Sequence, residues 1–157
     1  MGPFVSRASV APMAGRYGMS FAKKFIEDGE YDEAIAAATK SIEEGDTGPE
    51  PLFDRATAYD LAERYLDAVT DFEAAIAKNG AEQEIDPFTI DDAYFSALLS
   101  AARQEAERDV GKGVALLQRY MQNAPNGEHS AECGDWQKRL RGELPSLLDK
   151  TKDIGAP

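Results

Sequence analysis

The sequence predicts an all-α fold built from antiparallel helical hairpins that stack on one another. The main observation is a repeated stretch: residues 29–35 (GEYDEAI) return as residues 63–69 (ERYLDAV), 34 positions later. A repeat of this length is typical of helical hairpins, each of which must cover the apolar face of its neighbour. Apolar residues at helical spacing flank both copies, and glycine or proline separates the segments.

Apolar spacing and turn residues place about seven helices along the chain. The first begins between residues 15 and 19 and carries Phe21, Phe25 and Ile26 on one face. It is expected to end at Asp28-Gly29, because glycine supplies the positive φ that a helix end often needs. The later helices are expected over residues 31–44, 51–61, 65–78, 93–108, 110–123 and 130–143, with a turn at residues 62–64.

The 34-residue period breaks over residues 81–91, which we interpret as an inserted loop. Asp86-Pro87 has the composition of a turn, so the next helix is expected to begin at about Ala93. Asp91 or Asp92 is the expected N-cap, because a short acidic side chain can accept a hydrogen bond from the first backbone N–H groups of a helix.

The last part of the chain is expected to form a third hairpin and a capping helix. The third hairpin is weaker than the others, because Gly111 and Gly113 loosen its turn. Trp136 and Leu140, spaced i and i+4, give the final helix one apolar stripe opposite a charged face. Such a helix suits the open end of a stack.

Residues 15–48 and 49–82 resemble two tetratricopeptide (TPR) repeats, and residues 94–127 resemble a divergent third. The family has small residues at repeat positions eight and twenty and an aromatic residue at position eleven. The corresponding residues are Ala22, Phe25 and Ala34, then Ala56, Tyr59 and Ala68, then Ala101, Gln104 and Gly113. The third repeat therefore lacks the aromatic residue, and the family's tryptophan near each repeat start is absent.

The resemblance implies a TPR-like right-handed superhelix (an α-α superhelix) over residues 15–144, with the capping helix at 130–144. Residues 1–14 are expected to form a flexible basic leader, and residues 145–157 a tail. In such a stack the first helix of each hairpin lines the concave wall. The expected wall residues are Met19, Lys23, Ile26, Phe53, Asp54, Thr57, Asp60, Leu98, Leu99, Ala102 and Glu105.

The chemistry of this wall indicates which segment it binds. One TPR binding mode holds a peptide's C-terminal carboxylate with Lys and Asn side chains, but here Lys23 and Asp54 stand where the family has asparagines. Asp60 and Glu105 add further negative charge, which would repel a carboxylate. The wall is expected to bind a basic or mixed basic–apolar protein segment.

Charge and composition limit the partners and the compartment. The formal net charge is -12 and the pI about 4.5, so a nucleic-acid partner is not expected. No apolar run has the length of a membrane span. The single cysteine, Cys133, is consistent with the cytoplasm or another reducing compartment. Residues 1–26 carry four bases and no acid, so residues 1–18 are either a targeting segment, an arm that folds onto the acidic surface, or an appended leader.

We find no catalytic, cofactor or metal motif in the sequence. His129 and Cys133 are spaced i and i+4, but two ligands make a poor metal site. Residues 111–113 (GKG) lack the strand and the spacing of a phosphate-binding loop. The sequence therefore predicts a protein without enzymatic activity and without a cofactor.

The function expected from these observations is that of a non-catalytic adaptor or scaffold that binds a protein segment in its groove. Two alternatives stay open. One is a small chaperone that holds a secretion or assembly client, since chaperones of type III secretion translocators are similar in size and repeat number. The other is a structural subunit of a larger complex, which would use its outer face and the loop 81–91.

Overall fold

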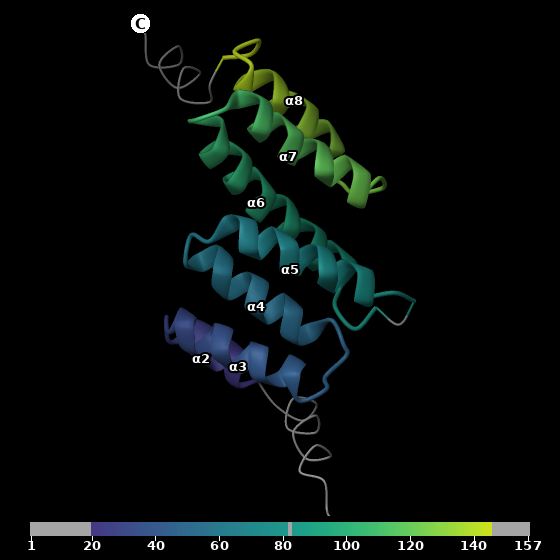
Figure 1. The fold of residues 1–157 in the computed structure, drawn as a ribbon. Helices are drawn as coiled ribbons and strands as arrows, with labels where there is room; N and C mark the ends of the chain where they lie inside the picture. The colour runs from purple at the N-terminus through teal and green to yellow at the C-terminus, as the bar shows by residue number, and fades with distance from the viewer. Residues whose placement is uncertain (1–19, 82, 146–157) are drawn as a thin grey trace, which may run out of the picture. The chain divides into compact units, whose positions relative to one another are not determined.

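The computed structural model describes residues 20–81 and 83–145, and their regular secondary structure is entirely helical (Figure 1). The all-α prediction is therefore confirmed. The predictions for residues 1–14 and for the tail beyond residue 145 lie outside the described residues. The helices are α2 (Phe21–Glu27), α3 (Tyr31–Glu43), α4 (Glu50–Leu61), α5 (Tyr65–Lys78), α6 (Pro87–Ala106), α7 (Val110–Asn123) and α8 (Ser130–Leu140).

The described residues divide into two compact units, the first ending at Ala97 and the second beginning at Leu98. The division falls within α6, so this helix contributes residues to both units. In the first unit, α2 packs on α3, α3 on α4 and α4 on α5, and α2 also contacts α4 directly. Successive helices form the predicted antiparallel pairs (Figure 1).

Small residues allow the helices of the first unit to cross closely. Ala34, Ala56 and Ala68 are completely buried, and Ala22 is 4% exposed. These four alanines stand at the small-residue positions that the TPR resemblance assigns to the first two repeats, and all four are buried. The aromatic ring of Phe72 on α5 is also buried.

Helix α2 starts later than the sequence predicted. Ser20 has an extended backbone and caps α2, since its Oγ accepts a hydrogen bond from the backbone N–H of Lys23 at 3.1 Å. The helix therefore begins at Phe21 rather than between residues 15 and 19. It ends as expected, with Gly29 at a φ of 77°.

The predicted start of α6 was wrong by six residues. The helix begins at Pro87, because the Asp86 carboxylate accepts hydrogen bonds from the Thr89 backbone N–H at 3.0 Å and from its hydroxyl at 2.9 Å. Proline suits a first helical position, where no N–H is needed. Asp86 is therefore the capping residue, and Asp91 and Asp92 lie within the helix rather than at its N-cap.

A buried asparagine closes the loop between α5 and α6. Asn79 is 8% exposed, and its side-chain amide donates to the Ile85 carbonyl at 2.8 Å and accepts from the Ile85 N–H at 2.9 Å. Ile85 then packs with Leu52, Ala75 and Ile90 in an apolar cluster. The inserted loop is thus fastened to the core at both ends.

An ion pair joins three helices of the first unit. Arg55 on α4 donates from Nε and Nη2 to the two carboxylate oxygens of Asp71 on α5, at 2.6 and 2.8 Å. Its Nη1 donates to the Thr39 hydroxyl on α3 at 3.1 Å. The hydrogen bonding of Arg55 to the Asp71 carboxylate is the main reason that the pKa of Arg55 is raised. Bidentate pairing of this kind fixes geometry as well as charge.

In the second unit, α7 packs against α8, and Gly113 marks a close helix crossing. A Cβ atom at Gly113 would lie 2.5 Å from the Ala102 carbonyl oxygen and 2.8 Å from the Ala106 Cβ. The prediction that Gly113 loosens a turn was therefore wrong, because this residue lies inside α7 and is buried. Its lack of a side chain lets α7 approach α6 within this unit.

The segment that leads into α8 and the Trp136 ring on α8 are held by polar and cation–π contacts. The Tyr120 hydroxyl accepts a hydrogen bond from the His129 backbone N–H at 3.1 Å, just before the helix starts. The guanidinium groups of Arg103 and Arg139 lie 5.3 and 5.2 Å from the centre of the Trp136 ring. The helix ends at Leu140, three residues earlier than predicted, since Gly142 follows with a φ of 77°.

No helix among residues 20–81 and 83–145 combines the length and the apolar character that crossing a bilayer requires.

Candidate protein-binding site

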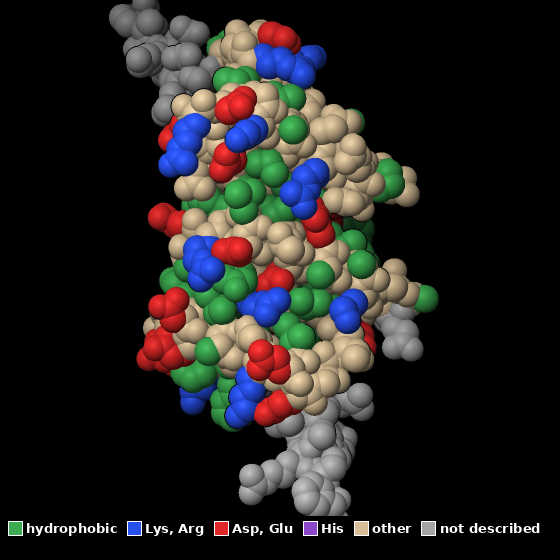
Figure 2. All heavy atoms as spheres, in the orientation of Figure 1, with side chains coloured by type: hydrophobic (Ala, Val, Ile, Leu, Met, Phe, Trp, Pro, Cys, Tyr) green, Lys and Arg blue, Asp and Glu red, His purple; other side chains and the backbone are tan. Residues whose placement is uncertain are grey.

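Negative charge is concentrated in the first unit. Its described residues, 20–81 and 83–97, include 19 acidic and 6 basic side chains, a net charge of −13. The described residues of the second unit, 98–145, include 7 of each sign and are neutral overall. Several acidic side chains lie over α2 and α3 on the face shown in Figure 2. A surface of this kind attracts cationic groups.

Two polar contacts connect α2 to α4. The Ser20 hydroxyl donates to Asp54 Oδ2 at 2.9 Å, while Lys23 Nζ lies 3.2 Å from Glu50 Oε2. The side chains of Lys23 and Glu50 are 45% and 43% exposed, so this pair lies at the surface and contributes little to stability. The contacts place the expected wall residues Lys23 and Asp54 at one junction.

The side chain of Asp54 is buried at this junction and is not part of the surface. Its exposed fraction is 3%. Burial raises its pKa from 3.8 to about 6, although the hydrogen bond from Ser20 and the charge of Lys23 both favour the ionised carboxylate. The placement of Asp54 on an exposed wall therefore needs correction, because the side chain is enclosed between α2 and α4.

One face of α4 stays accessible and carries mixed chemistry. It consists of Phe53, Thr57, Asp60 and Leu61, spaced i, i+4, i+7 and i+8, and we call it the α4 stripe. The first three residues are half-buried, and Leu61 is 46% exposed. An aromatic ring, a carboxylate and an aliphatic side chain thus follow one another along the stripe.

The residues of the α4 stripe differ in how firmly they are held. The Phe53 ring packs edge-on against Phe72, with ring centres 5.7 Å apart. Thr57 donates its hydroxyl hydrogen to the Phe53 carbonyl at 2.9 Å, so this hydroxyl is already engaged. Asp60 makes no side-chain hydrogen bond or ion pair with the described residues, and burial raises its pKa. Asp60 is therefore the polar group on this stripe that lacks a counter-charge.

The remaining expected wall residues are distributed unevenly. Met19 lies outside the described residues, and Ile26 on α2 is half-buried. In the second unit, Leu98 and Ala102 are completely buried and pack inside the chain, so they present no surface to a partner. Leu99 and Glu105 are half-buried.

Two residues of the candidate site were missed at the sequence level. Leu61 continues the helical spacing of Phe53 and Thr57, so periodicity alone would have predicted it on the same face. Glu50 had no such signal, since its pairing with Lys23 joins residues 27 positions apart. The local sequence shows only that Glu50 lies in a first helical turn, where a carboxylate is favourable.

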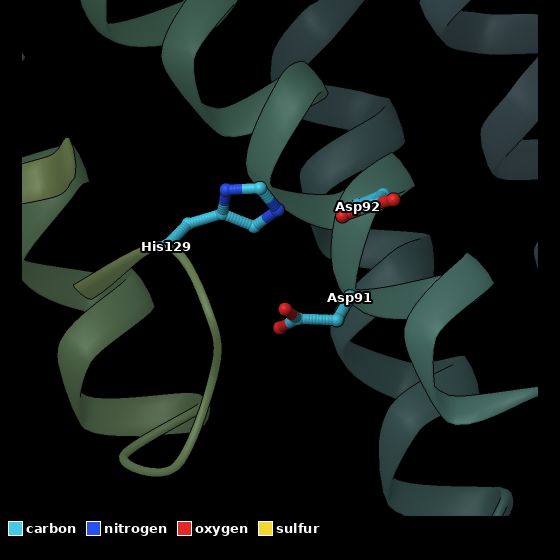
Figure 3. A group of neighbouring side chains, drawn as sticks. All are labelled: Asp91, Asp92 and His129. Carbon is cyan, nitrogen blue, oxygen red and sulfur yellow. The ribbon is translucent and has the colours of Figure 1, made fainter. Parts of the chain in front are cut away.

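Asp91, Asp92 and His129 carry groups that can bind metals, but we assign no metal site to them. Figure 3 shows both aspartates on α6 and His129 in the segment that precedes α8. The aspartates belong to the first unit and the histidine to the second. His129 Nδ1 lies 3.1 Å from Glu132 Oε1. Cys133, which follows His129 by four residues, is completely buried.

Comparison with known proteins finds neither a family model nor a curated protein sequence that matches this chain. The solved structures that are similar include one described as the first TPR of Spaghetti (RPAP3) bound to the HSP90 peptide SRMEEVD. The sequence identity is 22%, the TM-score is 0.48, and the match covers 88% of this chain and 94% of the other. The helical-hairpin fold described above is taken from this chain's own helix packing.

Proposed function

We propose that this chain is a non-catalytic protein-binding module, which binds a basic or mixed basic–apolar protein segment through its first unit. The observation that carries the proposal is the α4 stripe, where Asp60 lies between apolar side chains without a counter-charge. The surrounding charge of −13 favours the same class of partner. A cationic segment gains from both features, whereas an acidic segment would be repelled.

In the binding mode that we propose, α2 and α4 form part of one wall. Their direct contact, which skips α3, supports this arrangement because it brings the first helices of two successive hairpins side by side. Lys23 and Ile26 would contribute from α2, and Phe53, Thr57 and Asp60 from α4. Leu99 and Glu105, which belong to the second unit, stay predicted contact residues of that unit by itself.

Two peptides test the proposal directly. A 12-residue peptide that alternates lysine and leucine pairs is expected to bind, and the same peptide with glutamate in place of lysine is not. Isothermal titration calorimetry at two salt concentrations would measure both affinities, and added salt is expected to weaken binding of the lysine peptide. Equal affinity for the two peptides would overturn the proposal.

A matched pair of variants separates specific binding from general charge attraction. Glu50→Gln with Asp60→Asn removes two negative charges at the candidate site and is expected to weaken binding roughly 3- to 10-fold. Asp32→Asn with Glu33→Gln also removes two negative charges, but from exposed positions in the first turn of α3. If both double variants weaken binding equally, the charge of the unit, and not the α4 stripe, attracts the peptide.

A structural subunit of a larger complex is the second candidate function. Phe21 is 73% exposed and Phe88 is 61% exposed, and each lies in the first turn of its helix. Large apolar side chains at such exposure favour contact with another protein. Replacing both with serine is expected to abolish assembly in the subunit case and to leave peptide binding at the α4 stripe unchanged.

A further inference from the structure

Asp60 differs from the other half-buried or buried carboxylates in the first unit whose contacts are known. Asp71 is neutralised by Arg55 through two hydrogen bonds, and Asp54 accepts one from Ser20. Asp60 is half-buried as well but has no such donor among the described residues. A partly desolvated carboxylate without a donor is costly in the free chain, and this cost is relieved when a cation from outside reaches it.

The position of Asp60 within α4 also favours pairing of its carboxylate with a cation from outside the chain. It lies in the last turn of the helix, where the macrodipole presents its negative end and disfavours a carboxylate. The last turn of α4 contains no basic residue. Arg64, which follows the helix, is engaged elsewhere, since it pairs with Asp67 at 3.0 Å and lies over the Tyr59 ring.

We propose that Asp60 is the specificity-determining residue of the α4 stripe and receives an arginine side chain of the partner, with the aliphatic neighbours of that arginine resting on Leu61 and Phe53. This inference rests on the proposed function and deepens it from a basic segment to a particular side chain at a particular residue. Within two helical turns, the α4 stripe offers a carboxylate for the arginine and apolar side chains for its aliphatic neighbours.

Arginine suits this position better than lysine. A guanidinium group is less strongly hydrated than an ammonium group and offers two parallel N–H donors to one carboxylate. The chain itself shows the arrangement inside the first unit, where Arg55 binds Asp71 with both donors. Its lysine pair, Lys23 with Glu50, is a single contact at the surface.

The test uses the full chain and three short peptides that differ in one side chain. Their sequence is acetyl-Leu-X-Leu-amide, where X is arginine, lysine or citrulline, the uncharged analogue of arginine. Titration followed by NMR chemical-shift changes of the labelled protein measures weak affinities. We expect the arginine peptide to bind about 5- to 10-fold more tightly than the citrulline peptide, with lysine between them.

Asp60→Asn is the decisive variant, because it keeps the shape of the side chain and removes its charge. It is expected to reduce the preference for arginine over citrulline to less than about twofold. Asp32→Asn, an exposed aspartate of α3, is the matched control and is expected to retain the full preference. Circular dichroism checks that both variants keep the helix content of the unaltered chain.

The possible failures are distinguishable. If none of the peptides shifts residues of the α4 stripe, the proposed function itself is overturned. If the peptides bind there but Asp60→Asn keeps the arginine preference, binding stands and the role of Asp60 is overturned. Equal binding of the arginine and citrulline peptides to the unaltered chain would also overturn the inference.

Discussion

Gly29 and Glu63 occupy the same place in successive hairpins. Each follows a helix with a positive φ, 77° for Gly29 and 59° for Glu63. In both cases the next residue donates its backbone N–H five residues back, from Glu30 to Phe25 and from Arg64 to Tyr59, each at 2.8 Å. The two turns share one backbone geometry although only one of them contains glycine.

Glu63→Gly is expected to stabilise the chain by about 1 kcal/mol. The left-handed backbone at this position is unfavourable for a residue with a Cβ atom, and glycine removes that cost. Denaturant unfolding followed by circular dichroism measures the change. The reverse substitution, Gly29→Ala, is expected to destabilise by about 1–2 kcal/mol even though nothing lies within 4 Å of the added atom. A neutral result for both would show that neither turn is strained by a side chain.

Gly113→Ala and Gly134→Ala are expected to act in opposite directions. Both glycines lie inside helices of the second unit. The Cβ atom at Gly113 meets the Ala102 carbonyl oxygen at 2.5 Å, so overpacking is expected to cost about 1–3 kcal/mol. The Cβ atom at Gly134 has nothing within 4 Å, and alanine there is expected to stabilise by up to about 1 kcal/mol. Thermal unfolding of the two variants, measured side by side, decides whether the α6–α7 crossing is as close as described.

Asn79→Ala is expected to destabilise the first unit by about 2–4 kcal/mol. The substitution leaves the Ile85 N–H and C=O groups without their partner in a buried place, and each such group costs about 1–3 kcal/mol. Amide hydrogen exchange of Ile85 provides the local measurement, since its N–H should lose protection. Asn126→Ala, at an exposed asparagine in the turn that follows α7, is a control of the same chemistry. Retained protection at Ile85 in the Asn79 variant would contradict the assignment.

Asp54→Asn is expected to stabilise the chain at neutral pH and to have little effect below about pH 4. Because the folded-state pKa of Asp54 is raised to about 6, the folded chain binds its proton more tightly than the unfolded chain does. The free energy of unfolding contributed by this group therefore falls as pH rises from about 4 to about 6. Asparagine carries no charge to bury, so the gain above pH 6 is expected to be on the order of 1–3 kcal/mol. Unfolding curves at several pH values measure the difference in free energy of unfolding between the Asp54→Asn variant and the unaltered chain. A difference that stays constant from pH 4 to pH 7 would contradict the prediction.

The hairpins were predictable because their signals are local and repeated. Ala34 and Ala68 recur at the 34-residue period, and a helix crossing requires a small residue wherever it occurs. Apolar spacing and turn residues placed α5 and α7 at their observed bounds. Turns with positive φ were predictable at Gly29 but not at Glu63, since glutamate gives no sign of a left-handed backbone.

The start of α6 could have been predicted at Pro87, but the sequence contains two plausible N-cap sites for this helix. Asp86-Pro87 has turn composition, yet an aspartate followed by proline is also a favourable N-cap and first helical position. Asp91 and Asp92 provided a second plausible cap further along, and the sequence alone does not rank the two. The apolar residues Phe88 and Ile90 would have favoured the earlier start.

The candidate site was only partly predictable, because burial depends on contacts between distant residues. Asp54 and Asp60 lie on the same helix and have the same chemistry, but Ser20 and α2 cover only Asp54. Periodicity assigns both to one helix and cannot tell which of them a neighbouring helix encloses. Leu98 and Ala102 were misplaced for the same reason.

The double hydrogen bond between Asn79 and Ile85 also has a use in protein engineering. It joins Asn79 directly to Ile85, so we expect an insertion between these two residues to leave α5 and α6 in register. A fluorescent label, an affinity tag or a small inserted domain at this point should leave the packing of the first unit intact. The loop that interrupts the repeat is therefore the natural attachment point for reporters in the binding experiments above.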